Sequence, residues 1–457
     1  MNANLRAELA LDPDPLDRLT DGTIKQRNPL TGTQVWTVPG RAKRPSSHRD
    51  DGHEIPGRDL KPEDFTDTCA FCTNRYSDTP PEKSRLVKGV DGHFHKIEGL
   101  PAKSMHDMVA EFRRIPNLYE IVSYDYWHLN HNHYPSEEQN RRMAAYLATP
   151  EGYDHVLHVV KMRLQASGEG DPNDLPDEKL VQYATGLFAG GHDVIVAKRH
   201  YIDGATKDTQ NASAGTLSVA EHRAYTGYTI AAMEDLYGLN PAVKYVTAFQ
   251  NWLKPAGASF DHLHKQLVAV DEYGVQIEQE SQRVAANPLI YDQILHYAAH
   301  RQMAVLGNEH AIGFADFGHR YPTLAVWALG PALLPWEYSR EQVDGISDVL
   351  HALHCALGPD TPTNEEWYHR PVDLEVPMRF RILLKRRTST IAGFEGATRI
   401  YLNSVDPWTL RDEIVERLLQ LREQGLIAES LEIGNEYRLP DNPLGDFSSR
   451  VAEFRSH

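Results

Sequence analysis

The sequence predicts an α+β protein built from two fused halves, each with strands and flanking helices. The chain has 457 residues, which is more than one ordinary hydrophobic core organises. A strand, a helix that starts with a capping box, and a second strand occur twice along it, once in each half. Such units are common, so two of them can also arise by coincidence.

The first unit begins with an apolar strand over residues 193–197. It leads to Ser218-Val219-Ala220-Glu221, in which Ser and Glu can satisfy each other's free backbone N–H groups and start a helix. We expect this helix to end at Gly238. Two further strands are expected over residues 244–251 and 262–270.

The second unit begins with a strand over residues 323–329. Ser339-Arg340-Glu341-Gln342 is another capping box, and its helix is expected to end at Gly358. A strand-like stretch follows over residues 378–384. A final helix is expected to start at Asp406, with Pro407 in the first helical position.

The remaining segments set the expected domain boundaries. These are a loose lead-in over 1–25, a first half over 26–290 that contains an insertion at about 132–180, a second half over 291–430, and a tail over 431–457. The insertion is polar and carries two helical patterns, around 137–147 and 153–165.

Composition excludes several classes of partner. The formal net charge is −17, which argues against nonspecific binding to nucleic acid or to anionic membranes, since both need a basic face. No apolar run is long enough to span a membrane, and the N-terminal residues have no apolar signal-peptide core. Only three cysteines are present, so we expect no disulfide framework and a cytoplasmic location.

The strongest local pattern is Asp261-His262-Leu263-His264-Lys265-Gln266-Leu267. Alternate side chains of a strand share one face, so His262, His264 and Gln266 point the same way. Three polar groups on a buried face are costly unless they are paired. The pattern therefore indicates either a chemical site or an edge strand whose polar face contacts water.

A second pattern is Cys69-Ala70-Phe71-Cys72. A C-x-x-C pair can supply two of the four ligands of a structural zinc site, form a redox disulfide, or have no such role. We expect the remaining ligands of such a zinc site to be histidines. Cys355 lies at the edge of an apolar helix face and is interpreted as structural.

Two loops carry groups suited to phosphate. Arg41 and Arg44 lie in a basic turn over residues 40–45, where guanidinium groups can clamp a phosphate or simply contact solvent. Residues 249–251 and the small-residue loop 256–259 precede the histidine strand, and an ordinary turn is the alternative there. A separate group of histidines, His128, His131 and His133, is interpreted as polar surface.

Together these motifs resemble the galactose-1-phosphate uridylyltransferase branch of the histidine-triad superfamily. The resemblance covers roughly residues 25 to 425 and rests on the segments Arg27-Asn28-Pro29-Leu30-Thr31-Gly32, Gly40 to Pro45, Cys69-Ala70-Phe71-Cys72, Thr79-Pro80-Pro81-Glu82, Arg113-Arg114-Ile115-Pro116-Asn117, Gly191 to Val196 with His200, Phe249-Gln250-Asn251, Ala256 to Ser259, His262 to Gln266, Ala392-Gly393-Phe394-Glu395 and Tyr401-Leu402-Asn403.

The resemblance implies two fused halves of the histidine-triad type, each a mainly antiparallel sheet with flanking helices, usually assembled as a homodimer. It implies that Zn²⁺ is bound by Cys69, Cys72, His200 and His262. It makes His264 the nucleophile, with Gln266 on the phosphoryl oxygens. The implied nucleotide and phosphate contacts are Arg41, Arg44, Asn117, Asn251, Gly257 and Ser259.

The activity that follows is transfer of a nucleoside monophosphate from a nucleotide-sugar to a sugar 1-phosphate, through a covalent nucleotidyl-histidine. The alternatives are a phosphorylase that uses phosphate as acceptor and adenylate as the transferred group, or a zinc-stabilised binding protein with little catalysis. Gln266 favours transfer over hydrolysis, because an amide cannot protonate a leaving group.

The sequence also departs from the family pattern. Asp261 and Leu263 replace residues that are usually proline. In the second half, Met378-Arg379-Phe380-Arg381 stands where the family often has a metal-binding His-x-His pair. We therefore expect no iron site.

Overall fold

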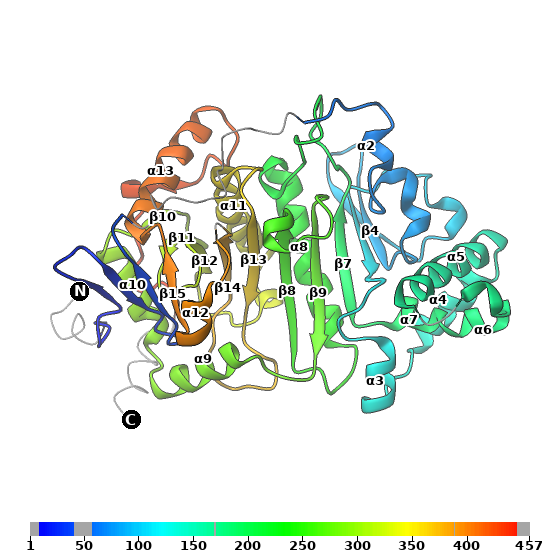
Figure 1. The fold of residues 1–457 in the computed structure, drawn as a ribbon, viewed down its shortest axis with the longest axis horizontal. Coiled ribbons are helices and arrows are strands. Elements are labelled where there is room, and N and C mark those ends of the chain that lie inside the picture. Colours follow the sequence, from blue (N-terminus) through cyan, green and yellow to red (C-terminus); the bar gives the residue numbers. More distant parts are fainter. Residues whose placement is uncertain (1–8, 41–56, 169–170, 388, 446–457) are drawn as a thin grey trace.

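The computed structural model describes residues 9–40, 57–168, 171–387 and 389–445. Within these residues one sheet has twelve strands, in the spatial order β16 (Glu432–Ile433), β10 (Ala304–Gly307), β11 (Ala311–Asp316), β12 (Thr323–Ala328), β14 (Arg381–Arg386), β13 (Thr363–Tyr368), β8 (Tyr245–Trp252), β9 (His264–Val270), β7 (His192–Ala197), β6 (Phe112–Pro116), β4 (Ser84–Lys88) and β5 (Phe94–Glu98). All neighbouring strands of this sheet are antiparallel. Figure 1 shows the sheet running across the whole molecule.

The sheet is a duplication joined at its centre, where β8 pairs with β13. Outward from this join the order is β8, β9, β7 and β6 on one side and β13, β14, β12 and β11 on the other. The segment β7–α8–β8–β9 therefore has the same path as β12–α11–β13–β14. The predicted α+β fold of two fused, mainly antiparallel halves is confirmed.

The two capped helices were predicted correctly. In α8 (Val219–Tyr237), the Ser218 hydroxyl accepts from the Glu221 N–H and the Glu221 carboxylate accepts from the Ser218 N–H. Ser339 and Gln342 do the same at α11 (Arg340–Leu357). The two helices pack side by side on one face of the sheet (Figure 1), and α13 (Pro407–Glu423), capped by Asp406, packs beside α11.

Strand β13 was not predicted, because the sequence pattern indicates one strand after α11 where the structure has two. Its sequence, Thr-Asn-Glu-Glu-Trp-Tyr, lacks the apolar pattern of a buried strand. It is nevertheless central in the sheet, because Glu365 is ion-paired inside the core and Trp367 packs there. Burial of a charged residue depends on its partner, and the local pattern does not reveal that partner.

The opposite face of the sheet is covered unevenly. In the second half, α9 (Val275–Ala286) and α10 (Ile290–His300) pack their apolar residues on β11, β12 and β14, burying Phe314 and Trp327. In the first half, the same face carries His264 and Gln266 and borders a large pocket. Because α9 and α10 cover this face only in the second half, the face in the first half is open to a ligand.

A second sheet has four strands in the order β1 (Leu16–Arg18), β2 (Ile24–Arg27), β3 (Gln34–Thr37) and β15 (Ile400–Asn403). We expected a loose lead-in over 1–25, but Leu16–Arg18 pairs with β2. Strand β15 is parallel to β3 and follows α12 (Gly393–Thr398), so the second half completes this N-terminal sheet.

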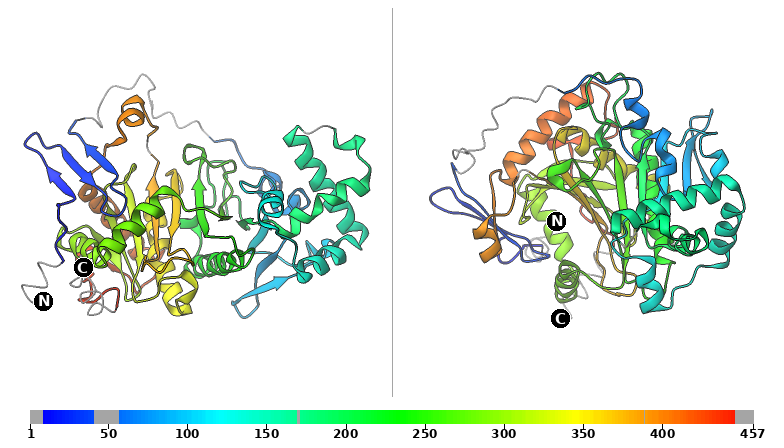
Figure 2. Two further views of the ribbon diagram at one scale, coloured as in Figure 1. Left: turned by 90° about the horizontal axis from the view of Figure 1, so that it is seen from below. Right: turned by 45° about the vertical axis from the view of Figure 1, so that its right-hand side comes forward.

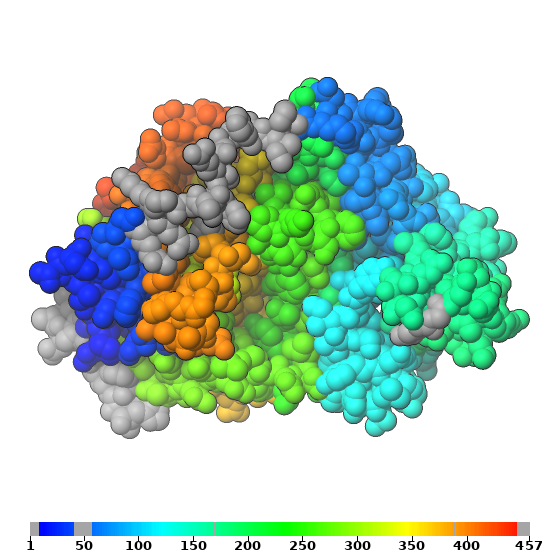
Figure 3. Space-filling model, in the orientation of Figure 1, coloured from blue at the N-terminus to red at the C-terminus, as the bar shows by residue number. Residues whose placement is uncertain are grey.

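The predicted insertion is a helical lobe beyond the first half, visible at one end of the molecule in Figures 2 and 3. The range predicted for it, about 132–180, contains α4 (Glu137–Leu147), α5 (Pro150–Ser167) and the start of α6 (Asp177–Gln182), and it lies between α3 (Tyr124–His131) and α7 (Ala184–Ala189). Helices α4 to α7 share a separate apolar cluster that includes Val156, Leu180 and Leu187, whereas Trp127 of α3 packs in the main core. His133 is not surface as expected: it is 4% exposed and its Nε2 bonds the Ala189 carbonyl. Across the described residues, no helix has both the length and the apolarity that crossing a membrane requires.

Candidate active site

Four potential metal ligands meet at one end of the first half. Cys69 and Cys72 lie just after α2 (Asp64–Asp67), His200 follows β7, and His262 precedes β9. Their ligand atoms all lie within 4.8 Å of one another, and all four residues are buried. The antiparallel pairing of β7 with β9 brings His200 and His262 together, and the segment after α2 adds the two cysteines.

The spacing of these atoms fits a tetrahedral zinc ion. The two sulfurs are 3.8 Å apart, and each sulfur lies 3.5 to 3.8 Å from the Nδ1 atoms of His200 and His262. A Cys2His2 zinc site with ordinary bond lengths has edges of about 3.8 Å between sulfurs and about 3.6 Å between sulfur and nitrogen. The Nε2 atom of His262 is 2.6 Å from the Ala197 carbonyl, which leaves Nδ1 free for a metal.

His264 is the next residue on the same face of the strand. Its Nδ1 lies 2.7 Å from the carbonyl oxygen of His262 and donates to it, so Nε2 carries the lone pair of the neutral ring. The ring is 5% exposed, and burial lowers its pKa to about 4. The Phe71 ring of the C-x-x-C segment packs against it, with centroids 5.2 Å apart. Chemically, His264 offers a neutral imidazole with one free nitrogen.

Gln266 lies two residues further along the same face and is half-buried. Its Oε1 is 3.1 Å from Nε2 of His192 and 3.4 Å from Nδ2 of Asn117. The structure therefore brings predicted residues Asn117 and Gln266 together. His192, which was predicted only as part of a strand, joins them.

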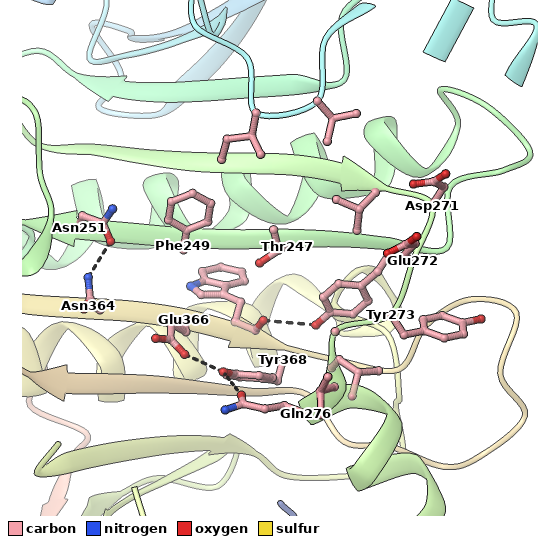
Figure 4. A pocket seen from close by; sticks show the side chains of 18 of the residues that line it. Thr247, Phe249, Asn251, Asp271, Glu272, Tyr273, Gln276, Asn364, Glu366 and Tyr368 are labelled. Atoms are coloured by element: carbon pink, nitrogen blue, oxygen red, sulfur yellow. Dashed lines mark hydrogen bonds between the residues drawn. The ribbon is translucent and has the colours of Figure 1, made fainter. Parts of the chain in front are cut away.

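A pocket of about 1190 Å³ opens on this face of the sheet. Phe249 and Thr247 of β8 form part of its floor, and Phe249 is the register partner of Gln266. Asp271 and Glu272 lie at one end of the pocket (Figure 4). Further lining residues come from the loop before α3, from the loop that leads into α9, from α9 itself and from β13, so both halves contribute.

At its other end the pocket carries a row of polar groups from the two halves. The Nδ2 of Asn364 donates to Asn251 Oδ1 at 2.6 Å (Figure 4), and Arg387 donates to Asn364 Oδ1 at 2.5 Å. Arg387 is the one basic side chain among the described residues that line the pocket. Asn251 was predicted, whereas Asn364, which lies in the unpredicted strand β13, and Arg387, which follows β14, were missed.

The other predicted contacts lie in the loop between β8 and β9 or outside the described residues. Gly257 has φ +91°, a conformation that favours glycine, and its Cα faces the Asn251 side chain. Ser259 is exposed in the same loop. Arg41 and Arg44 lie outside the described residues.

In the second half the place equivalent to His264 is taken by Arg381. His264 is the register partner of Val196, the fifth residue of β7, and Arg381 is the partner of Trp327, the fifth residue of β12. Arg381 forms a fully buried ion pair with Glu280 of α9. The second half thus holds an ion pair where the first half holds the free imidazole.

Comparison with protein families gives one match that spans nearly the whole chain. A family described as "Domain of unknown function (DUF4921)" matches residues 19–445. The chain belongs to this DUF4921 family. No curated protein matches the sequence of this DUF4921 member.

Solved structures reveal the fold of the DUF4921 chain. It is similar to an ADP-glucose phosphorylase from Arabidopsis thaliana with bound ADP-glucose, at 16% identity and a TM-score of 0.55, over 86% of this chain and 98% of the other. It is also similar to a galactose-1-phosphate uridylyltransferase-like protein from Arabidopsis thaliana, at 15% identity and a TM-score of 0.52, over 85% and 97%. The uridylyltransferase-like fold predicted from the sequence is therefore confirmed.

Proposed function

We propose that this chain is a nucleotidyltransferase that moves a nucleoside monophosphate from a nucleotide-sugar to a sugar 1-phosphate, through a covalent nucleotidyl group on His264. The observation that carries the proposal is the state of His264. Its ring is neutral, Nδ1 donates to the His262 carbonyl, and Nε2 is left as an acceptor on the strand face that His264 shares with Gln266, whose register partner Phe249 lines the pocket. Such an imidazole is a nucleophile suited to phosphorus.

In the first step, Nε2 of His264 attacks the α-phosphorus of the donor. An N–P bond forms, the bond from phosphorus to the bridging oxygen breaks, and the sugar 1-phosphate leaves with both electrons of that bond. The ring becomes positively charged, and the hydrogen bond from Nδ1–H to the His262 carbonyl strengthens as this charge develops.

In the second step, a phosphate oxygen of the acceptor attacks the same phosphorus and releases Nε2. The amide of Gln266 donates to the phosphoryl oxygens in both steps, and it cannot deliver a proton to a leaving group. We assign Asn251, Arg387 and the loop of Gly257 and Ser259 to contacts with the anionic substrate. A zinc ion bound by Cys69, Cys72, His200 and His262 would supply rigidity. It would hold His262, which lies just before β9, the strand that begins with His264.

A second candidate acceptor is inorganic phosphate. The similarity to an ADP-glucose phosphorylase over 86% of this chain favours it, with adenylate as the transferred group. Both candidates share the covalent step and differ only in the acceptor. The homodimer, the cytoplasmic location and the division at residue 290 expected from the sequence stay predictions.

Trapping the intermediate tests the proposal. Protein incubated with UDP-glucose or ADP-glucose carrying ³²P in the α-phosphate should retain label that is acid-labile and stable in alkali. After digestion, the label should be found in the peptide that contains His264. The His264→Ala variant should lose it, whereas His95→Ala, which changes an exposed histidine, should keep it.

The acceptor is identified by a chase of the labelled protein. Release of label as a nucleotide-sugar on addition of a sugar 1-phosphate supports the first candidate, and release as a nucleoside diphosphate on addition of phosphate supports the second. Tight donor binding without label in the wild-type protein would instead show a binding protein and end the catalytic proposal.

A further inference from the structure

The amide of Gln266 has two possible orientations, and only one of them serves the proposed chemistry. An amide nitrogen directed toward the phosphoryl group donates hydrogen bonds to it, whereas an amide oxygen would repel it. Oxygen and nitrogen of a glutamine are nearly equivalent in shape, so packing alone does not select between them. The surrounding hydrogen bonds decide.

The hydrogen bonds begin at a backbone group. Nδ1 of His192 lies 3.1 Å from the backbone N–H of Ile121. A backbone N–H only donates, so Nδ1 must be the acceptor, and the proton of the ring is on Nε2. His192 is 1% exposed, and burial lowers its pKa to about 4, so the ring is neutral near pH 7.

The proton on Nε2 of His192 then determines the orientation of the Gln266 amide. Two polar atoms lie near it, Oε1 of Gln266 at 3.1 Å and Nδ2 of Asn117 at 3.0 Å. Asn117 presents its nitrogen there because its Oδ1 accepts from the Tyr119 N–H at 2.9 Å. The acceptor for His192 is therefore the Gln266 oxygen, which also lies within 3.4 Å of the Asn117 amide nitrogen.

We propose that His192 is a positioning residue that orients the Gln266 amide, so that its oxygen is held by His192 and its NH₂ group faces the phosphoryl group on His264. This inference rests on the proposed function, because it assigns the task of one side chain in the same site. The Ile121 N–H donates to Nδ1 of His192, and Nε2–H of His192 donates to the Gln266 oxygen. The loop after β6 thereby sets the polarity of the site.

Two substitutions test the roles of the two ring nitrogens of His192 separately. His192→Asn keeps an oxygen near the position of Nδ1, which can accept from Ile121, and loses the donor to Gln266. His192→Gln keeps a donor near the position of Nε2. We expect His192→Asn to slow labelling of His264 by about tenfold or more at an unchanged KM for the donor, and His192→Gln to stay within a few-fold of wild type.

A double-variant cycle distinguishes positioning from a general structural effect. If His192 acts through Gln266, adding His192→Asn to a Gln266→Ala protein should cause no further loss of rate. Equal and additive losses, or a larger loss in His192→Gln than in His192→Asn, would overturn the proposal.

A spectroscopic measurement keeps this test separate from the proposed function. In protein labelled with ¹⁵N-histidine, the His192 signals should report a proton on Nε2, and the side-chain NH₂ signals of Gln266 should shift in His192→Asn. A proton on Nδ1 of His192 overturns the positioning role in any case. Absence of ³²P label in the wild type, with Nε2 protonated, would count against the proposed function alone.

Discussion

At the residue scale, the Cys2His2 cluster links segments that the sequence keeps far apart. The C-x-x-C loop contributes the two sulfurs, and the ends of β7 and β9 contribute the imidazoles. The position of His262 matters most for the site, because its carbonyl oxygen also accepts from His264. A bound metal would therefore restrain His264, the proposed nucleophile, through one residue of backbone.

We predict that the purified protein contains about one zinc ion per chain and no iron. The Cys72→Ala variant should lose the zinc and unfold at a lower temperature, because it removes one of four ligands from a buried site. Elemental analysis and thermal unfolding measure both effects. Iron in amounts equal to zinc would contradict the reading of Met378 to Arg381.

The third cysteine provides a matched control for this experiment. Cys355 is buried in α11, and its thiol donates to the Gly215 carbonyl rather than to the cluster. Cys355→Ala should keep its zinc content. A loss of zinc in this variant would mean that general destabilisation, and not ligand removal, releases the metal.

At the scale of elements, the two faces of β9 have different surroundings. His264 and Gln266 face the pocket, whereas Lys265 points into the core toward α8 and pairs with Glu365 of β13 at 2.5 Å. The two side chains are 0% and 1% exposed, and Glu365 also accepts from His354 at 2.7 Å. The pKa of Glu365 lies below its ordinary value because Lys265 and His354 outweigh the effect of burial. This pair ties β9 to the second half.

We predict that Glu365→Gln lowers the free energy of unfolding by about 3–5 kcal/mol, since it leaves the Lys265 charge buried without a carboxylate. Urea unfolding at neutral pH measures the change. Replacing both partners, in Lys265→Met with Glu365→Leu, should recover part of the loss.

A surface pair serves as the control for the buried one. Glu436 is bonded by Arg422 near the end of α13, with both side chains substantially exposed. Glu436→Gln should change stability by less than about 1 kcal/mol. An equal effect of the two substitutions would show that burial does not matter for the Lys265–Glu365 pair.

At the scale of the whole molecule, several histidines are buried as neutral groups away from the proposed site. Burial lowers the pKa of His369 to about 3 and that of His351 to about 4, and the pKa of His222 also lies well below its ordinary value. His369 lies next to the join of the halves, where it stacks on Tyr245 of β8 and its Nε2 is 2.8 Å from the Tyr237 hydroxyl. Protonating these rings requires opening the core.

The sign of the pH effect follows from these shifts. Each histidine has a lower pKa in the folded than in the unfolded chain, so the unfolded chain binds more protons as the solution is acidified. The contribution of these histidines to stability is fully present above about pH 6.5, their pKa in the unfolded chain. It is lost as the pH decreases toward their lower pKa values in the folded chain. We predict a lower urea midpoint at pH 5 than at pH 8.

The His369→Gln variant checks the origin of this loss. It removes one titrating ring and keeps a polar group opposite Tyr237, so its midpoint should fall less between pH 8 and pH 5 than that of the wild type. A wild-type midpoint that is constant over this range would contradict the prediction.

Much of the fold could be predicted because its determinants are local. The capping boxes at Ser218 and Ser339 satisfy backbone groups within four residues, and the helices begin where the sequence indicates. The face shared by His262, His264 and Gln266 follows from the two-residue period of a strand. Strand β13 escaped prediction because its buried Glu365 has partners on other elements.

The sequence by itself determined the capped helices, the strand that carries two histidines and a glutamine, and the motifs that resemble the uridylyltransferase-like fold. Only the tertiary structure decided that both halves share one sheet, that Asn364 and Arg387 enter the pocket, and that a backbone N–H of Ile121 sets the tautomer of His192. The physical reason is the separation in sequence between the residues that interact. Caps and strand periodicity act between residues close in sequence, whereas burial, ion pairs and hydrogen-bond direction depend on whichever distant residue the fold places alongside.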